Sequence, residues 1–571
     1  MSLDKSKLSR LIGDYHHGNL GRREFIKNAG LLGVSASMAG SLAVAFSNHG
    51  FASTTRATEQ KTGPYDYIIV GSGSAGASLA YRLATTTDAS ILVLEAGGMD
   101  DLPEIHDPRL WGATLSTRAT KWFPTTPQEN TAGQEHMWPR GNVIGGTSAL
   151  NAMIYARGHR TDFDGWAAAG CEGWDFQSVL KHYKALEDWE GGANEYRAVG
   201  GPLSITRPQP DLRHPGGQMF IDASTSMGFE ETEDFNGPQM EGPAWVNFTI
   251  KDQRRQSTGV AFLKPAMASD NLTVLTEAPV TRLLVESGRC VGVEYLHDGQ
   301  PTVVRAGEEV ILSAGAIDSP RILMHSGIGP KEDLVRVGIP VVVNLPGVGQ
   351  NLQDHLLGGG PNYESPTPLP ESNYNASEVY MWAKSDSTLE APDMITLYLS
   401  IPFSSPALPM DGIQNGWSIL SGLARPTSKG SVKLRSNRIS DLPIIDPNYL
   451  GTEHDRRVFS KATELARETA LQTAFDSVRA REWLPGDNIR PGTEAWNEFI
   501  GKCAHTFFHP TSTCKMGVDD MAVVDPELRV NGISNLRVAD ASVMPNITTG
   551  NTNAPSIMIG WKCAEMIRNQ A

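Results

Sequence analysis

Residues 65–76 have the sequence YDYIIVGSGSAG, and this stretch decides the fold. A β-rich run at 65–70 leads directly into three glycines with the spacing G-x-G-x-x-G. Residues 77–84 have helical character, and residues 90–94 form a second β-rich run that ends at Glu95. Strand, glycine turn, helix, strand and acid in this order predict a Rossmann-type unit that binds a dinucleotide.

Each residue type in this unit has a physical reason. Gly71 makes the tight turn, Gly73 lets backbone N–H groups approach a pyrophosphate, and Gly76 allows the helix to pack closely on the strand. Glu95 can accept hydrogen bonds from the adenosine ribose. The pattern alone does not separate NAD from FAD. The predicted nucleotide-binding residues of the unit are Gly71, Gly73, Ser74, Ala75, Gly76, Glu95 and Ala96.

Composition and charge narrow the class of protein. The chain has 571 residues, of which 40% are hydrophobic and 20% charged, as in an ordinary soluble enzyme. The net charge is -15 and no long Lys/Arg run occurs, so we expect no nucleic-acid partner. The five cysteines form no CxxC pair, which favours buried free thiols. His505 and His509 are four apart, but no Glu lies between them and the segment looks extended, so we expect no metal site.

The N-terminal segment has the features of an export signal. Residues 21–27, GRREFIK, match a twin-arginine export signal, and a weakly apolar segment at 31–46 follows. That segment is too short for a stable membrane span, which needs about 20 apolar residues. We therefore predict that 1–61 are signal and linker and that the twin-arginine machinery exports the chain to the periplasm, with no stable span in the mature protein. An exported enzyme has no pool of free nicotinamide cofactor, which favours a retained FAD.

Four further segments extend the pattern along the chain. They are 140–151 (RGNVIGGTSALN), 315–330 (beginning GAIDSP), 347–355 (GVGQNLQDH) and 509–555, which begins with His-Pro. In their order and spacing, these segments and the N-terminal unit resemble the glucose–methanol–choline (GMC) oxidoreductases over about 64–571. The resemblance implies an FAD-dependent enzyme that oxidises an alcohol.

The resemblance also implies which residues contact FAD. It places the loop 140–151 along the pyrophosphate and flavin, the backbone of Val280 at the adenine, and Asp540 near the ribityl chain and pyrophosphate. The further cofactor residues implied are Arg140, Val143, Gly146, Thr147, Asn151, Ala152, Met153, Val280, Ala314, Asp540, Ala541, Asn551 and Thr552. Some members of this family attach FAD covalently to a histidine two residues before this arginine. That position is Trp138 here, so the resemblance implies that FAD is held non-covalently.

Alcohol oxidation needs a hydride acceptor and a proton acceptor. Flavin can take the hydride, and a histidine with a pKa near 6.5 suits the proton. By the resemblance, His509 is this base. A His or Asn near the C-terminus is the expected partner, and both Asn551 and Asn553 are candidates, with Asn551 preferred. His355 fits a family motif, but no chemical role for it follows from the sequence.

The predicted fold class is α/β (α+β overall), with a Rossmann-like FAD-binding domain interwoven with a substrate domain on an antiparallel sheet. The FAD-binding domain is expected at 62–165, 225–330 and 520–571, and the substrate domain at 166–224 and 331–519.

The identity of the substrate stays open at this stage, beyond a small-molecule alcohol. Choline specificity would need an acidic or aromatic cage that the sequence does not place. Electrons must leave to oxygen, a quinone or a separate carrier, and the predicted location favours a dehydrogenase. Two alternatives on the same scaffold are a non-redox lyase or light-driven fatty-acid decarboxylase, and a catalytically silent flavoprotein.

Overall fold

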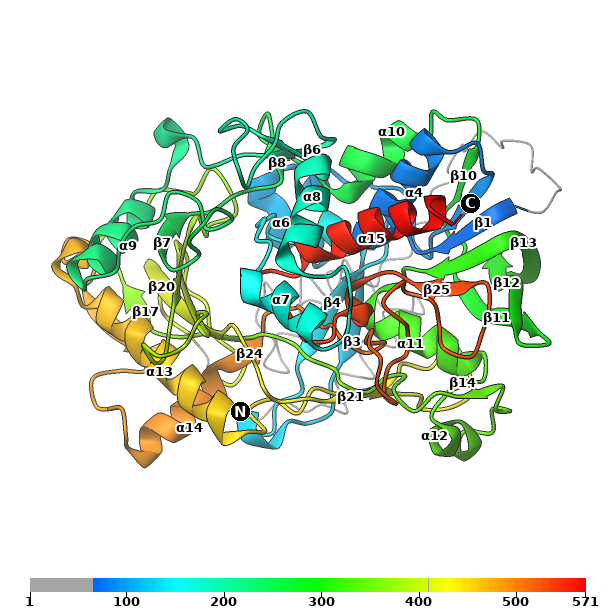
Figure 1. Cartoon of the computed structure of the whole chain (residues 1–571). Helices are drawn as coiled ribbons and strands as arrows, with labels where there is room; N and C mark the ends of the chain where they lie inside the picture. Colours follow the sequence, from blue (N-terminus) through cyan, green and yellow to red (C-terminus); the bar gives the residue numbers. More distant parts are fainter. Residues whose placement is uncertain (1–64, 409, 571) are drawn as a thin grey trace, which may run out of the picture.

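The computed structural model describes residues 65–408 and 410–570. The predicted export signal and linker at 1–61 lie outside the described residues. Two large sheets organise the molecule, one around β1 on the right of Figure 1 and one around β20 on its left. Each sheet has its own apolar core.

The first sheet is the predicted Rossmann-like sheet. Its order is β10-β2-β1-β13-β12-β11, and β25 pairs with β13. The strands β1, β2, β10, β13 and β25 pair in parallel, and β11, β12 and β13 form an antiparallel extension. Parallel strands covered on both faces are expected to be nearly continuous apolar runs, and β2 is buried along its whole length. The bounds are β1 Tyr65–Val70, β2 Ile91–Leu94, β10 Leu272–Leu275, β11 Val280–Glu286, β12 Arg289–His297, β13 Gln300–Leu312 and β25 Leu536–Val538.

Two helices close one face of this sheet. Helix α4 (Ser74–Thr86) follows the glycine turn, and the C-terminal helix α15 (Asn553–Arg568) lies along it (Figure 1). Gly560 makes this approach possible, because a Cβ there would lie 2.1 Å from the Ala75 carbonyl oxygen. The C-terminal helix is thus locked to the helix that begins the nucleotide site.

The second sheet is antiparallel, as predicted, with the order β23-β17-β20-β19-β18-β7. Strand β16 pairs with both β20 and β24. Helices α9, α13 and α14 pack with the outer face of this sheet in one core. The bounds are β7 Gly242–Trp245, β16 Leu356–Gly358, β17 Asn362–Glu364, β18 Val379–Ala383, β19 Met394–Leu399, β20 Gly416–Leu423, β23 Arg481–Leu484, β24 Ala504–Thr506, α9 Pro215–Ser226, α13 Glu453–Ala470 and α14 Glu494–Cys503.

Smaller elements connect these two layers. The helices are α5 Pro103–His106, α6 Trp111–Thr114, α7 Arg160–Ala168, α8 Phe176–Leu186, α10 Lys264–Ala266, α11 Gly315–His325 and α12 Lys331–Arg336. The paired strands are β3 Thr120–Pro124 with β4 Met137–Gly141, β5 Glu187–Trp189 with β6 Leu203–Ile205, β8 Ile250–Lys251 with β9 Arg254–Arg255, β14 Ile328–Gly329 with β15 Val343–Asn344, and β21 Ser431–Lys433 with β22 Ile444–Asp446.

The course of the chain differs from the predicted domain boundaries. Strand β7 lies within 225–330, which we assigned to the FAD-binding domain, yet it pairs with β18 in the second sheet. Helix α8 lies within 166–224, assigned to the substrate domain, yet Val179 and Tyr183 pack in the core of the first sheet. Apolar periodicity shows that a segment is buried, but it does not show which of two sheets it covers.

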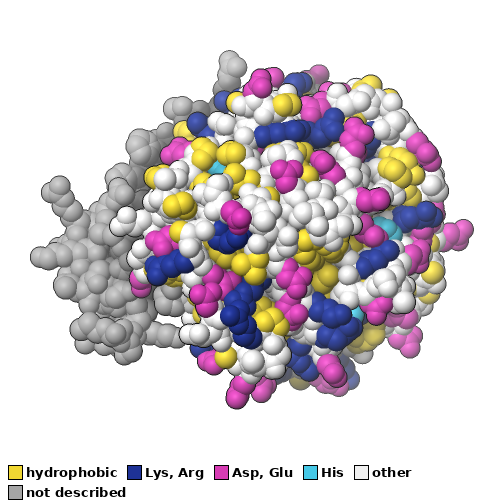
Figure 2. Space-filling model, turned by 90° about the vertical axis from the view of Figure 1, so that its left-hand side faces the viewer, with side chains coloured by type: hydrophobic (Ala, Val, Ile, Leu, Met, Phe, Trp, Pro, Cys, Tyr) yellow, Lys and Arg dark blue, Asp and Glu magenta, His cyan; other side chains and the backbone are white. Residues whose placement is uncertain are grey.

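The outer face of the second layer carries acidic and basic side chains side by side (Figure 2). None of the helices within 65–408 and 410–570 has the length and apolar character that a bilayer crossing requires.

Candidate active site

The first glycine turn joins β1 to α4, and its three glycines do different work. Gly71 has φ +96°, and a Cβ there would lie 2.6 Å from the Ser313 carbonyl oxygen. A Cβ at Gly76 would lie 2.0 Å from the Gly71 carbonyl oxygen. At Gly73 an added Cβ would meet nothing nearer than 3.9 Å, so this glycine keeps the N-terminus of α4 open. Backbone N–H groups at a helix N-terminus favour an anionic ligand such as a pyrophosphate.

The second glycine loop lies directly against the first. Gly146 has φ +53°, and a Cβ there would lie 2.7 Å from the Gly73 Cα. The Gly145 N–H donates to the Ser72 carbonyl oxygen at 2.9 Å. Two loops that are about 70 residues apart in the sequence therefore form one cradle made of bare backbone.

Glu95 holds the glycine turn from the end of β2. One carboxylate oxygen accepts the Ser72 N–H at 2.9 Å and the Ser72 hydroxyl at 2.7 Å, and the other accepts the Gly97 N–H at 2.8 Å. A carboxylate offers about four acceptor positions, so about one remains for a ribose hydroxyl. Burial raises the pKa of Glu95, and these three hydrogen bonds act against that shift.

Asp540 ties the end of β25 to the start of α11. Its carboxylate accepts the Gly315 N–H at 2.8 Å and the Ser319 hydroxyl at 2.5 Å. Near the end of β2, the Ala278 N–H donates to the Glu95 carbonyl oxygen at 2.8 Å, which brings the start of β11, at Val280, to the same region.

Of the predicted cofactor residues, those that follow the parallel strands, such as Glu95, Ala314 and Asp540, thus lie at the carboxyl edge of the first sheet, where α/β sheets bind ligands. Those that keep partial exposure and can face a ligand with side chain or backbone are Gly71, Gly73, Ser74, Arg140, Thr147, Asn151, Ala152, Ala314, Ala541 and Asn551, while Ala96 is exposed. Ala75, Gly76, Gly146, Val280 and Thr552 are buried in the same loops and elements. The side chains of Val143 and Met153 pack in apolar clusters, so any contact they make with a cofactor comes from the backbone.

His509 and Asn551 lie together at the junction of the two layers. The Asn551 Nδ2 is 3.3 Å from the His509 Nε2. Asn553, the other candidate partner, instead accepts a hydrogen bond from the Ser74 hydroxyl at 2.7 Å. The geometry therefore selects Asn551 as the neighbour of His509 and places Asn553 at the start of the nucleotide helix.

A third buried residue, His355, fixes the tautomer of His509. The His355 Nε2 is 3.0 Å from the Ala424 carbonyl oxygen, which only accepts, so this nitrogen carries the hydrogen. The two Nδ1 atoms of His355 and His509 are 3.0 Å apart. In a neutral His355 the Nδ1 is an acceptor, so the His509 Nδ1 must donate, and the His509 Nε2 keeps its lone pair.

Both imidazoles are held neutral. Burial lowers the pKa of His355 to about 4. Burial, then His355 and Arg140, lower the pKa of His509 well below its ordinary value. At neutral pH the His509 Nε2 is therefore an unprotonated acceptor.

The Asn551 side chain offers a polar atom without a protein partner. Its Oδ1 is buried and accepts no hydrogen bond from the described residues. A buried acceptor left unpaired costs free energy, and a bound ligand that donates a hydrogen bond would recover it. This atom, beside the Nε2 lone pair and the bare glycine cradle, fits a bound flavin cofactor and a hydroxyl substrate.

Two features of this site escaped the sequence reasoning. His355 ends the motif 347–355, but a contact between two imidazoles leaves no signal in the spacing of the chain. Arg140 was predicted to bind the cofactor, yet its Nη2 donates to the Phe508 carbonyl oxygen at 2.6 Å and its Nε to the Pro139 carbonyl oxygen.

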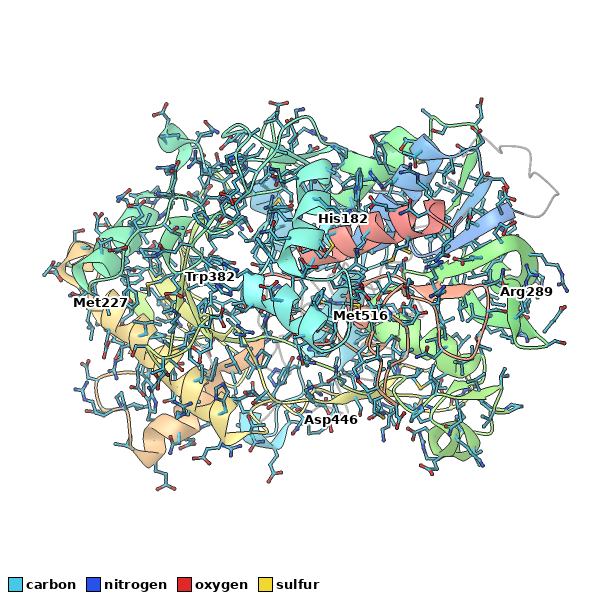
Figure 3. All side chains as sticks on the ribbon, viewed as in Figure 1. His182, Met227, Arg289, Trp382, Asp446 and Met516 are labelled. Carbon is cyan, nitrogen blue, oxygen red and sulfur yellow. The ribbon has the colours of Figure 1, made fainter. Side chains whose placement is uncertain are left out.

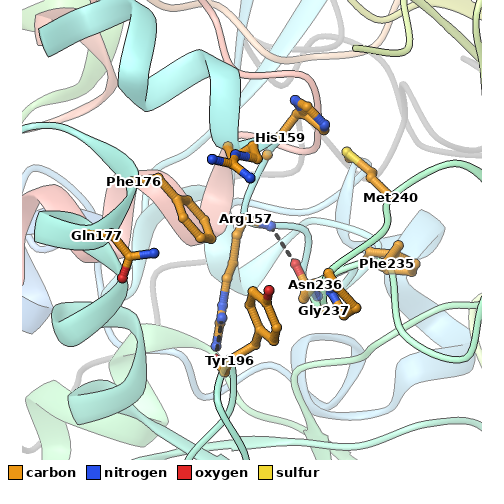
Figure 4. Close-up of a pocket in the computed structure, with 12 residues that line it drawn as sticks. Arg157, His159, Phe176, Gln177, Tyr196, Phe235, Asn236, Gly237 and Met240 are labelled. Carbon is orange, nitrogen blue, oxygen red and sulfur yellow. Dashed lines mark hydrogen bonds between the residues drawn. The ribbon is translucent and has the colours of Figure 1, made fainter. Parts of the chain in front are cut away.

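A separate pocket lies between the start of α8 and the segment 235–240 (Figure 4). Arg157, His159, Asn236 and Met240 are among its lining residues, and the Arg157 N–H donates to Asn236 at 2.8 Å. The Arg157 guanidinium is fully buried and pairs with Glu187 at 2.7 Å, so its charge is already balanced. Neither His509 nor Asn551 lines this pocket. Within the described residues, no group of three His, Cys, Asp or Glu side chains is arranged to hold a metal ion.

Known proteins agree with this architecture. A family model described as GMC oxidoreductase matches residues 65–357, and its C-terminal companion matches 426–560. Human mitochondrial choline dehydrogenase is 40% identical over 537 residues, which cover 89% of this chain and 90% of that protein. Pyridoxine 4-oxidase from Mesorbium loti has a TM-score of 0.85 and 37% identity, and the match covers 88% of this chain and 99% of that one. Formate oxidase from Aspergillus oryzae, whose FAD modification is described, has a TM-score of 0.81, 25% identity and coverage of 89% and 98%.

The Rossmann-like sheet, the double glycine cradle and the desolvated histidine define a dinucleotide-dependent oxidoreductase. More particularly, the chain belongs to the GMC oxidoreductase family.

Gly146→Ala should release FAD. The new Cβ meets the Gly73 backbone and forces a left-handed residue to carry a side chain, so we expect at least about tenfold weaker FAD binding. FAD is measured by its absorbance after acid precipitation, which also tests whether it is held non-covalently. The matched control is Gly165→Ala inside α7, where an added Cβ meets nothing within 4 Å. That control should keep its FAD and gain about 0.5–1 kcal/mol of stability. Equal FAD content in the two variants would contradict the cradle.

Proposed function

We propose that this chain oxidises a neutral alcohol with a largely apolar body, with His509 as the general base and Asn551 as the group that orients the hydroxyl. The class itself is that of an FAD-dependent oxidoreductase acting on CH–OH donors. The observation that carries the proposal is the unprotonated Nε2 of a neutral, part-buried His509, which lies 3.3 Å from the Asn551 amide nitrogen and beside the unpaired Oδ1 of Asn551.

The residues of this chain handle the proton of the reaction. His509 takes the hydroxyl proton at Nε2, since its other nitrogen is occupied by His355. Asn551 cannot take a proton, but its amide fixes the direction in which the hydroxyl presents that proton. When bound, FAD would supply the acceptor for the hydride that leaves the alcohol carbon. The glycine cradle, Glu95 and Asp540 would hold the cofactor.

The surroundings of the pair favour an uncharged substrate. Phe507 stacks on His509, with ring centroids 4.6 Å apart, and packs against an apolar cluster of the second sheet. Within that cluster Trp382 is fully buried and its indole N–H donates to the Thr549 carbonyl oxygen at 3.1 Å (Figure 3). The other members from the strands of the sheet are Ala244, Leu357, Tyr380, Ile395, Leu397, Leu399 and Leu420.

Aromatic faces such as that of Trp382 can attract a quaternary ammonium, but the described part of this layer has no buried carboxylate without hydrogen-bond partners. The buried carboxylates there already accept hydrogen bonds from neighbouring groups, and they are Asp162, Asp354, Glu378, Asp393 and Asp455. Moving a cation from water into such surroundings without a counter-charge is costly. Choline, the substrate in the name of the human relative, is therefore the critical comparison.

The test compares choline with 3,3-dimethyl-1-butanol, which has nearly the same shape but a carbon in place of the charged nitrogen. We expect the neutral alcohol to have a kcat/KM at least about tenfold higher, because it loses no ionic hydration on binding. The rate is followed as anaerobic bleaching of the flavin. A kcat/KM for choline equal to or above that of the neutral alcohol would overturn the substrate proposal. Absence of bleaching by any alcohol would overturn the role of the site in alcohol oxidation.

Substitution of the proposed base tests the mechanism. His509→Ala should retain FAD and slow flavin reduction by about 10²–10⁴-fold, since general-base catalysis contributes that much. Asn551→Ala should have a smaller effect, because it removes orientation but not the proton acceptor. The control is His182→Gln in α8, a buried histidine that lies beside Glu565 of α15, and this variant should reduce flavin at the parent rate. A His509→Ala variant that reduces flavin at the parent rate would refute the assignment.

We also propose that residues 1–61 direct export to the periplasm by the twin-arginine machinery, as the GRREFIK sequence suggests. The electron acceptor would then be oxygen, a quinone or a separate carrier, and the location favours a dehydrogenase. Replacing Arg22 and Arg23 by lysine should leave the protein in the cytoplasmic fraction. Unchanged export of this variant would exclude the pathway.

A further inference from the structure

The residue before the proposed base has an unusual backbone conformation. Phe508 has φ +64°, in the left-handed region that glycine and asparagine enter readily and that a bulky aromatic residue does not. The conformation turns the chain abruptly after β24 and so determines where the next residue, His509, projects. A strained residue of this kind persists only where its surroundings hold it.

Both polar backbone atoms of Phe508, and the N–H of His509, are held by side chains. Its N–H donates to the Thr506 hydroxyl at 2.8 Å, and its carbonyl oxygen accepts from the Arg140 guanidinium at 2.6 Å. The following N–H, of His509, donates to the Asp354 carboxylate at 2.7 Å. Three side chains thus hold two consecutive peptide groups: Arg140 and Asp354 come from distant segments, and Thr506 lies two residues before Phe508.

The three side chains are themselves tied together. The Asp354 carboxylate also accepts the Thr506 hydroxyl at 2.6 Å and the Tyr449 hydroxyl. Asp354 is 4% exposed, so its hydrogen bonds do not compete with bulk water. Burial raises the pKa of Asp354 to about 6, and the hydrogen bonds to this carboxylate and the nearby Arg140 charge act against that shift.

We propose that Arg140, Asp354 and Thr506 are positioning residues that hold Phe508 in the left-handed conformation, and that this conformation aims the His509 imidazole at Asn551. The inference rests on the proposed role of His509. It assigns to Arg140 a task different from the cofactor contact that the sequence suggested. The three residues act through the backbone of residue 508 and touch no reacting atom.

The decisive experiment combines two changes. Arg140→Met removes the bond to the Phe508 carbonyl but keeps most of the side-chain volume. In the parent background we expect FAD content to stay unchanged. The rate of flavin reduction should fall by at least about tenfold, because the His509 imidazole no longer points toward Asn551. In a Phe508→Gly background, residue 508 enters the left-handed region without strain. There the same Arg140→Met change should cost less than about threefold.

A merely structural role for Arg140 would give a different result. It predicts the same loss in both backgrounds, and a cofactor role predicts loss of FAD in both; either outcome overturns the proposal. Arg140→Lys, which keeps a donor, should recover part of the rate. If Arg140→Met does not fold, Thr506→Val removes the acceptor for the Phe508 N–H with little change of shape and should show the same dependence on Phe508→Gly.

A crystal structure of the Arg140→Met variant separates this idea from the proposed function. We expect φ of residue 508 to become negative and the distance from the His509 Nε2 to the Asn551 Nδ2 to exceed 3.3 Å. If φ of residue 508 and the His509–Asn551 distance are unchanged, Arg140 does not hold Phe508 in its conformation, even where His509 is the base. Flavin reduction at the parent rate in His509→Ala would refute the role of His509 as the base. The effect of Arg140 on the conformation of residue 508 would still hold in that case.

Discussion

The contact between the Nδ1 atoms of His355 and His509 is the constraint on which the chemistry of this site depends. Two nitrogens 3.0 Å apart can share only one hydrogen, and the Ala424 carbonyl decides which ring supplies it. Burial matters as much as the contact, because a protonated His355 would offer a second donor and force the rings apart. The low pKa of both imidazoles therefore preserves the tautomer that leaves the His509 Nε2 available.

Sheet pairing brings these two rings together from segments about 150 residues apart. Strand β16 directly follows His355, and it pairs with β24, which ends three residues before His509, with Leu356 opposite Thr506. A shift of this register by one residue would turn the side chains to the other face of the sheet. The antiparallel sheet thus sets the base, while the parallel sheet sets the glycine cradle, and the site exists only where the two layers meet.

The sequence predicts the part of this site that depends on local backbone. The glycine turn at 71–76, Glu95 and the adjoining strands follow from steric rules that act over a few residues, and the structure has them where the pattern indicates. The choice between Asn551 and Asn553 could not be made in this way. The two lie at the start of α15, and only the packing of that helix on α4 sends Asn553 to Ser74. The contact of Arg140 with Phe508 could not be predicted from local sequence either, because the two residues are 368 positions apart.

The chain of hydrogen bonds behind the base also decides where the proton can go. If His509 takes a proton at Nε2, its Nδ1 hydrogen still points to His355, whose own hydrogen points to the Ala424 carbonyl. A backbone carbonyl accepts a hydrogen bond but does not take up a proton, so this path ends inside the protein. The positive ring would then lie where burial and Arg140 both disfavour it. The proton must therefore leave from the Nε2 through which it entered, toward Asn551 and the substrate side, so the pair holds the proton briefly and does not relay it to the core.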